Sequence, residues 1–290
     1  MFRDLFKYYK SKAAPPDLSS VLYIEDESEN IIKKQPLPCS NELEQQLQSL
    51  GLVPSLNWKL FEHAEHAGLF ILKNPFTDDG AYSWIKRCLS EYPSYPNKCN
   101  LHSHNLLSPN ENWWDVCHKE AERGLELFDK LRWVTLGYHH DWDRKVYSES
   151  NKSEFPKELA CLISCLGQVI GGWDVKAEAG IVNIYHMNST LSGHTDSSEP
   201  NSTAPLFSIS FGQRAIFLIG GRKLEDKATP IMLENGDVIV MSGDSRLCYH
   251  GVPRIVPTPW PKGDEYIQFL SNARINLNIR QVLNIDQNSL

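Results

Sequence analysis

The stretch Gly180–Asp196, GIVNIYHMNSTLSGHTD, contains two pairs of polar residues, Asn183 with Tyr185 and His194 with Asp196. The members of each pair are two residues apart. Because side chains alternate between the two faces of an extended strand, each pair projects from one face. A histidine and an aspartate on one face can bind the same metal ion, but the set of two histidines and one carboxylate that holds non-haem iron needs a second histidine. The stretch therefore predicts two of three iron ligands.

The sequence further along supplies a second histidine and an anion-binding strand. His250 closes the segment Gly236–His250, in which an apolar run flanked by glycines predicts a buried strand, a turn and a second strand that carries the histidine. Residues 271–280 then alternate strictly between polar and apolar side chains, so one face of one strand carries Arg274, Asn276, Asn278 and Arg280. Two arginines that face one cavity indicate an anionic ligand.

The order of these elements, HxD, a distant histidine and then RxNxNxR, resembles the AlkB family of 2-oxoglutarate-dependent oxygenases. The segments Leu131–Tyr138, Ser210–Gly221 and Ala273–Leu283 resemble most closely the branch typified by the first mammalian AlkB homologue, and the resemblance covers nearly the whole chain. It implies Fe(II), 2-oxoglutarate and O2 as cofactors. It also implies iron ligands at His194, Asp196 and His250, and cosubstrate contacts at Asn183, Tyr185, Arg274, Asn276 and Arg280.

The resemblance implies oxidative demethylation of an N-methylated nucleobase, such as 1-methyladenine in tRNA or 6-methyladenine in DNA, with release of succinate, CO2 and formaldehyde. Spacing alone does not separate this family from other cupin-like oxygenases. Two alternatives therefore stay open. One is a protein (histone) demethylase or hydroxylase that uses the same iron, and the other is a metal-independent abasic-site lyase or nucleic-acid binder.

Composition limits the partners and the compartment. The chain has 290 residues, 41% of them hydrophobic, and a net charge of −7, so any contact with nucleic acid must come from local basic patches. We therefore expect unpaired or bulged bases to be better substrates than bases in continuous duplex. Seven cysteines without a CxxC pair indicate free thiols in a reducing compartment, which favours an intracellular protein of the nucleus, cytoplasm or mitochondrion. No apolar run is long enough to span a membrane, and a monomer is expected.

An aromatic and basic segment before the iron motif is the predicted contact surface for the substrate. Stacking and phosphate contacts together stabilise a base that has left its stack. We assign this role to Tyr138, His140, Arg144, Lys145 and Tyr147, whereas Trp133 is expected in the core because large aromatics dominate buried area.

The predicted fold is mainly β with a helical extension around a double-stranded β-helix, or jelly roll. Three parts are expected, namely an N-terminal helical arm and linker at 1–60, a helical extension for nucleotide recognition at 61–175, and the jelly-roll dioxygenase core at 176–290. Strands are expected at 178–186, 205–212, 214–220, 236–241, 246–255 and 273–283.

Smaller patterns complete the prediction. Residues 2–10, 78–92 and 155–171 are expected to be helices, residues 17–40 a solvated linker with an acidic run at 25–29, and residues 60–76 a single strand. His63 and His66 are expected at the surface. Cys99, His102 and His104 offer only three ligands, where a structural zinc site needs four, so no zinc is expected there.

Overall fold

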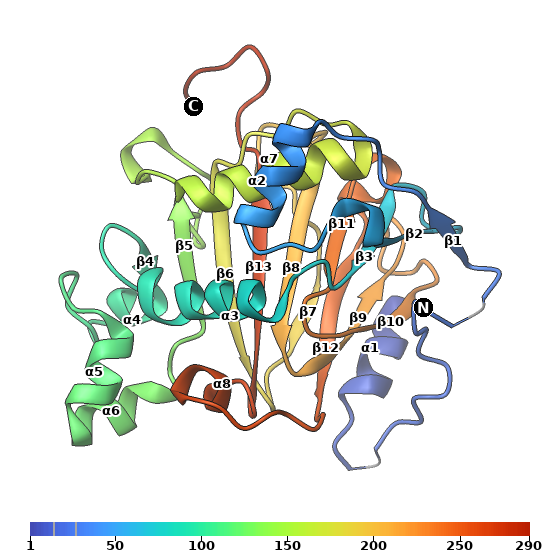
Figure 1. The fold of residues 1–290 in the computed structure, drawn as a ribbon. Helices are drawn as coiled ribbons and strands as arrows, with labels where there is room; N and C mark the ends of the chain where they lie inside the picture. The colour runs from blue at the N-terminus through green and yellow to red at the C-terminus, as the bar shows by residue number, and fades with distance from the viewer. Residues whose placement is uncertain (14, 27) are drawn as a thin grey trace.

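Two antiparallel sheets form the centre of the molecule. The computed structural model describes residues 1–13, 15–26 and 28–290. Figure 1 shows the large sheet with helices across it. Its nine strands run in the order β1 (Ile31–Lys34), β2 (Lys59–His63), β3 (Leu69–Lys73), β11 (Val238–Met241), β8 (Leu206–Gly212), β13 (Ala273–Arg280), β6 (Ala179–His186), β5 (Trp133–Gly137) and β4 (Lys98–Cys99). The small sheet has the order β10 (Thr229–Leu233), β9 (Arg214–Ile219), β12 (His250–Val256) and β7 (Leu191–His194). This arrangement confirms the predicted jelly roll with a helical extension.

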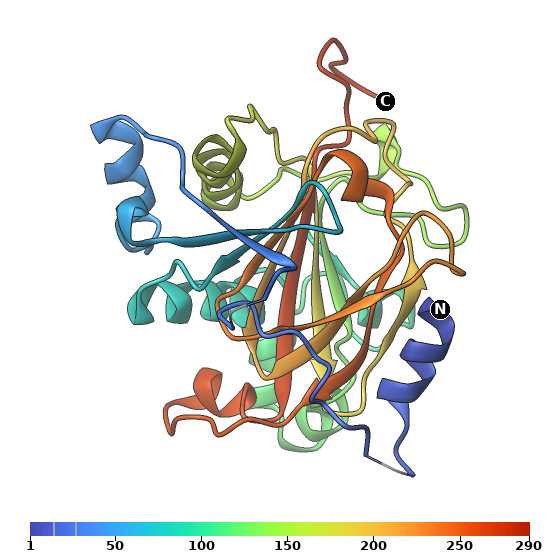
Figure 2. The same ribbon diagram turned by 90° about the vertical axis from the view of Figure 1, so that its right-hand side faces the viewer.

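Helices cover the outer faces of the two sheets. One side of the large sheet is covered by α2 (Asn41–Ser49), α3 (Asp78–Lys86) and α7 (Lys157–Gly171). The opposite side of the molecule holds α1 (Phe2–Lys10), which lies against the small sheet (Figure 2). The shorter helices are α4 (Asn100–Ser103), α5 (Trp113–Lys119), α6 (Ala121–Phe128) and α8 (Glu265–Phe269). None of the helices in the described ranges is long and apolar enough to cross a membrane.

Strand β13 shows how the alternating pattern divides the molecule. Ile275, Leu277 and Ile279 are buried in the main apolar core, which they share with residues of α3 and α7. The alternate residues share the other face, as the sequence predicts, and the structure turns that face toward the small sheet. β13 pairs with β6 in a register that sets Arg274 opposite Tyr185 and Asn276 opposite Asn183. The large sheet thus presents one polar strip toward the small sheet.

The helices predicted at 155–171 and at 2–10 are confirmed. α7 begins after Pro156 and is capped at its C-terminal end by Gly172, whose φ of 68° is the left-handed conformation that glycine tolerates best. α1 buries Phe2 and Tyr9 against the outer face of the small sheet. A Cβ atom at Gly193 would lie 2.4 Å from the Phe2 ring, so the strand that leads into His194 is close-packed against this helix.

Three local predictions need correction. Residues 17–40 are not simply a solvated linker, because Val21 and Ile24 are buried and residues 31–34 pair with β2; Glu27 of the acidic run lies outside the described residues. Residues 60–76 form two strands joined by a turn at Gly68, where φ is +83°. Strand β10 is absent from the expected strands; it contains Pro230, which is tolerated because β10 lies at the edge of the small sheet.

The division into 1–60, 61–175 and 176–290 stays a prediction. The large sheet takes strands from each of the three ranges, since β1 lies in the first, β3 to β5 in the second, and β6, β8, β11 and β13 in the third. The site described next lies between the two sheets.

Candidate metal centre and anion pocket

Three predicted ligands meet at one edge of the small sheet. His194 ends β7 and His250 begins β12, and the two residues are directly paired across these strands. Asp196 follows β7 by two residues, with Oδ1 3.7 Å from Nε2 of His194 and Oδ2 3.5 Å from Nε2 of His250. Ligand atoms of the three residues lie within 4.8 Å of one another, and no other such group of three occurs in the described ranges. The donor set fits a divalent iron ion with an open face.

The two histidines are oriented by backbone carbonyls. Nδ1 of His194 lies 2.9 Å from the carbonyl oxygen of Ser192, and Nδ1 of His250 lies 3.1 Å from that of Cys248. A carbonyl oxygen only accepts hydrogen bonds, so Nδ1 carries the proton and Nε2 is left unprotonated on the neutral ring. Both rings therefore offer Nε2 to the space beside Asp196.

The charge states of these groups also suit a metal. Burial alone would raise the pKa of Asp196, but the positive charge of Arg280, with help from His250 and His194, holds the pKa well below its usual value. Burial lowers the pKa of His194, and the nearby His250 lowers it further. At neutral pH the carboxylate is ionised and the His194 imidazole is neutral, as metal coordination requires.

A cavity of about 780 Å³ joins the three ligands to the polar strip of the large sheet. Arg274 lies in it with 2% of its surface exposed. Its Nη2 donates to Oγ of Ser210 at 2.9 Å, and its guanidinium carbon lies 5.2 Å from the centre of the Tyr185 ring. Nε and Nη1 have no hydrogen-bond partner among the described residues. A buried guanidinium with two unused donors fits a carboxylate ligand.

The other predicted cosubstrate residues have different surroundings. Asn183 and Tyr185 line the cavity beside Arg274. Asn276 donates from Nδ2 to Oγ of Ser208 at 2.7 Å, which leaves its carbonyl oxygen free to accept. Arg280 also lines the cavity, but its guanidinium already donates to protein groups, including Oδ1 of Asp196 at 3.0 Å. In this structure Arg280 therefore binds the metal ligand Asp196.

Sequence reasoning missed three partners of this cluster. Asn278 donates to Oδ2 of Asp196 at 3.2 Å, and its place on the polar face of the strand could have indicated this. Glu199 and Arg246 are both buried and join the network around Asp196 and Arg280. Glu199 lies outside every expected strand, and Arg246 lies in a short helical turn at Gly243–Leu247 where the sequence predicted the start of a strand, so the sequence carries no signal for their contact.

The predicted substrate residues divide into two groups. His140 and Lys145 line the cavity, and Nε2 of His140 lies 3.1 Å from Oγ of Ser198. Tyr138, Tyr147 and Arg144 do not line it, so their assignment to the contact surface for the substrate needs correction. Both tyrosine rings are buried in a small apolar cluster, with their hydroxyls bonded to Glu149 and Glu199 respectively. Arg144 points to solvent, with 81% of its side chain exposed.

Two tryptophans stand where the tyrosines were expected. Trp142 lines the cavity and is 47% exposed, and its ring centre lies 4.6 Å from that of His140. Trp133, expected in the core, is only half-buried; its ring centre lies 5.5 Å from that of Trp142. It lines a neighbouring cavity of about 770 Å³, which shares Asn183 and Tyr185 with the first. Trp142 and Trp133 therefore form an aromatic wall on one side of the cavity.

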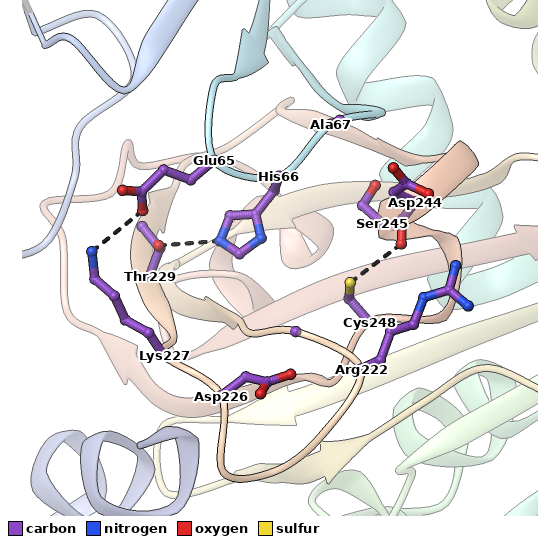
Figure 3. A pocket seen from close by; sticks show the side chains of 11 residues that line it. Glu65, His66, Ala67, Arg222, Asp226, Lys227, Thr229, Asp244, Ser245 and Cys248 are labelled. Atoms are coloured by element: carbon purple, nitrogen blue, oxygen red, sulfur yellow. Dashed lines mark hydrogen bonds and ion pairs between the residues drawn. The ribbon is translucent and has the colours of Figure 1, made fainter.

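In the described ranges, the other histidines that the sequence singled out do not gather into a group of three ligands. His63 is fully buried, which corrects the expected surface position, and burial lowers its pKa to about 4. His66 lines a separate cavity of about 440 Å³ and lies 3.2 Å from Oγ1 of Thr229 (Figure 3). His102 accepts a hydrogen bond from the backbone of Cys99 at the start of α4, and no zinc cluster forms with His104 in the part of the chain that the structure describes.

Comparison with known proteins agrees with this geometry. The pattern of the 2OG-Fe(II) oxygenase superfamily matches residues 68–280. The nucleic acid dioxygenase ALKBH1 of Homo sapiens is 35% identical over 331 aligned residues, which cover 99% of this chain and 85% of that protein. The tRNA demethylase abh1 of Schizosaccharomyces pombe is 33% identical over 77% of this chain and 82% of its own length. The solved structure of OsALKBH1 shares the fold with a TM-score of 0.52, at 21% identity, over 74% of this chain and 96% of that one. The chain thus belongs to the AlkB family of Fe(II)- and 2-oxoglutarate-dependent dioxygenases.

Proposed function

We propose that this protein removes methyl groups from N-methylated bases in nucleic acid. Fe(II) binds to His194, Asp196 and His250, and the distal carboxylate of 2-oxoglutarate binds to Arg274. The observation that supports this most directly is the pair of unused donors on buried Arg274, which open into the same cavity as the three ligands. The similarity to a nucleic acid dioxygenase and a tRNA demethylase supports the substrate class.

The residues of the cavity then have distinct tasks. The guanidinium of Arg274 forms two parallel hydrogen bonds with the carboxylate, and Tyr185 borders the same end of the cosubstrate. Asn183 and Asn276 line the path from there to the metal. Bound Fe(II) supplies the activation of O2 that couples decarboxylation of 2-oxoglutarate, to succinate and CO2, with hydroxylation of the N-methyl group, which leaves as formaldehyde.

The opening of the cavity suits a base that has left its stack. Trp142 and His140 provide ring surfaces, and Lys145 provides a positive charge for a phosphate. The net charge of −7 gives the chain little general attraction for phosphate, so little binding energy is available to unpair a base. Bases in loops, bulges or single strands are therefore the preferred substrates, with 1-methyladenine in tRNA and 6-methyladenine in DNA as the first candidates.

The state and compartment of the protein belong to the same proposal. All seven cysteines are free thiols, which supports a reducing compartment such as the nucleus, the cytoplasm or the mitochondrion. We also propose a monomer, a state compatible with a site whose metal ligands and cosubstrate residues all come from one chain.

A side-by-side assay of formaldehyde and succinate tests the proposal. The substrates are a methylated RNA stem-loop, DNA with a methylated bubble, the matched duplex and a methylated histone peptide. We expect turnover on the loop and the bubble to exceed that on the duplex, with His250→Ala inactive on all four. Equal rates on loop and duplex would refute the preference for unpaired bases. A preference for the peptide would refute the nucleic-acid substrate, and activity of His250→Ala would refute the metal site.

A further inference from the structure

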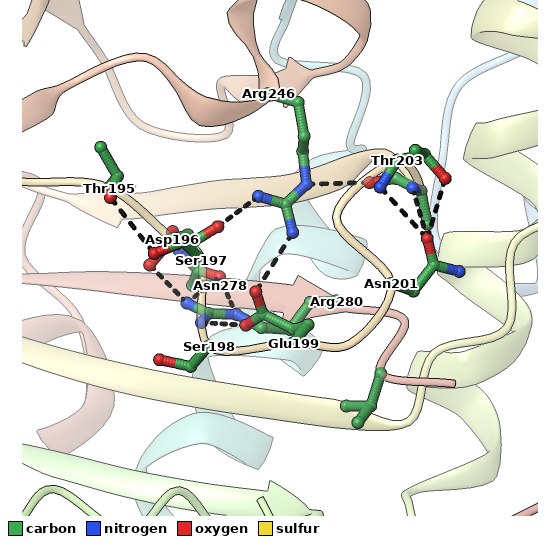
Figure 4. Close-up of polar contacts among 12 residues, drawn as sticks. Thr195, Asp196, Ser197, Ser198, Glu199, Asn201, Thr203, Arg246, Asn278 and Arg280 are labelled. Carbon is green, nitrogen blue, oxygen red and sulfur yellow. Dashed lines mark hydrogen bonds and ion pairs between the residues drawn. The ribbon is translucent and has the colours of Figure 1, made fainter. Parts of the chain in front are cut away.

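A buried glutamate joins the two arginines that surround Asp196. The side chain of Glu199 has no exposed surface. Its Oε1 accepts from Nη1 of Arg280 at 2.5 Å, and its Oε2 accepts from Nη2 of Arg246 at 3.3 Å (Figure 4). Each carboxylate oxygen is thus used by a different arginine.

Each arginine also holds Asp196, at different atoms. Arg280 reaches the carboxylate, with Nη2 3.0 Å from Oδ1. Arg246 reaches the backbone, with Nη1 2.6 Å from the carbonyl oxygen of Asp196, and it binds the carbonyl oxygen of Ala204 through Nε at 2.9 Å. The side chain and the main chain of the metal ligand are therefore fixed by two groups that share Glu199.

The geometry of Arg280 shows what Glu199 contributes. Nη1 and Nη2 lie in one rigid plane, so a bond from Nη1 to Glu199 sets the direction of Nη2 toward Asp196. Nε donates to Oδ1 of Asn278 at 3.1 Å, which holds the third corner of the plane. Without the Glu199 charge, Arg280 would keep the Asp196 carboxylate as its one ion-pair partner among the described residues, and Arg246 would have none. Arg280 would then draw that carboxylate away from the histidines.

We propose that Glu199 is a positioning residue of the metal centre, which sets the direction of the Asp196 carboxylate through Arg280 and of the Asp196 backbone through Arg246. This inference rests on the proposed iron site. Glu199 itself does not touch the metal, the cosubstrate or the reacting atoms. Groups that orient the ligands of a metal typically change its affinity by about 10- to 100-fold when they are replaced.

Binding of Co(II), followed by its visible absorption in the absence of 2-oxoglutarate, tests this role. Glu199→Gln keeps the size of the side chain but removes the charge, and we expect it to weaken Co(II) binding by about 10- to 100-fold. Asp237→Asn is the matched control. The Asp237 side chain is likewise unexposed and lies 2.8 Å from Nζ of Lys73, outside the cavity. This variant should lose stability and keep its Co(II) affinity.

The outcomes separate the inference from the proposed function. If His250→Ala binds Co(II) as tightly as wild type, the proposed iron site itself is refuted. If that binding depends on His250 but Glu199→Gln binds as tightly as wild type, only the role of Glu199 is refuted. An equal loss in Asp237→Asn also refutes it, because the effect is then general destabilisation. If Glu199→Gln does not fold, Glu199→Asp decides: it keeps the charge but reaches only one arginine, so wild-type affinity contradicts the inference and weakened affinity supports it.

Discussion

Replacement of Arg274 by lysine is the sharpest test of the anion pocket. The buried guanidinium has one donor bonded to Ser210, and Nε and Nη1 are unused by the described residues. Nη2 carries two hydrogens and Ser210 takes only one, so a carboxylate can form two parallel bonds with Nη2 and one of its unused neighbours, Nη1 or Nε. A lysine keeps the positive charge but presents one compact ammonium group, so it cannot form the same two-point contact.

The size of the effect follows from the lost contact. A hydrogen bond that involves a charged group contributes about 1.5–3 kcal/mol. Because about 1.4 kcal/mol corresponds to a factor of ten in affinity, the loss of one such bond weakens 2-oxoglutarate binding by about 10- to 150-fold. The three metal ligands are unchanged, so Co(II) affinity should stay within about twofold of wild type, well under that 1.4 kcal/mol.

The assay is succinate release over a range of 2-oxoglutarate concentrations, with Co(II) binding measured separately. Arg214→Lys is the matched control, since Arg214 bonds to Thr258 outside the cavity, and its KM for 2-oxoglutarate should equal that of wild type. A KM for Arg274→Lys within about twofold of wild type would refute the assignment. A loss of Co(II) binding in the same variant would show that the arginine supports the metal centre instead.

Three further perturbations test other parts of the structure. His250→Ala should abolish Co(II) binding while it lowers the free energy of unfolding by only about 1–3 kcal/mol, and a variant that still binds the metal would contradict the ligand assignment. Trp142→Ala should raise the KM for a methylated RNA loop by about 5- to 150-fold, as expected from a lost stacking contact of about 1–3 kcal/mol, with the KM for 2-oxoglutarate unchanged; an unaltered KM for RNA would place the base elsewhere. His63 has a pKa of about 4 in the folded protein against 6.5 for an unperturbed histidine, so its contribution to stability is present above pH 6.5 and is lost as the pH falls through 4. In urea titrations, the free energy of unfolding of wild type should therefore fall between pH 7 and pH 4 by about 3 kcal/mol more than that of His63→Gln. An identical fall in both proteins would show that His63 is not the titrating group.

The strands around the metal centre could be predicted because their pattern is local. Alternation placed Arg274 and Asn276 together on one face of their strand, and Asn183 and Tyr185 together on one face of theirs, each within a single segment. The structure adds that these two segments are hydrogen-bonded neighbours in direct register. That pairing depends on sequence-distant contacts, for which only the family resemblance gave a guide.

The substrate edge and the positioning network were harder to predict. In the loop after β5, aromatic residues occur at several positions, and nothing local shows that Trp142 faces the cavity while Tyr138 packs inside. Glu199 is separated from Arg246 by almost fifty positions and from Arg280 by about eighty, so their ion pairs exist only in the folded chain. A buried charge is normally unfavourable, and the sequence does not say which charges find partners.

The two halves of the active site belong to different sheets, and this has a thermodynamic consequence. His194 and His250 lie on the small sheet, whereas Arg274 lies on the large one. A cosubstrate that binds the metal at one end and Arg274 at the other would act as a removable cross-link between the two layers. Ligands that bind only the folded state raise its stability by RT ln(1 + [L]/Kd), about 2.7 kcal/mol at a hundredfold excess over Kd. Resistance to unfolding should thus rise and fall with the supply of 2-oxoglutarate. An enzyme that lacks this cosubstrate is then both inactive and more easily degraded by proteases.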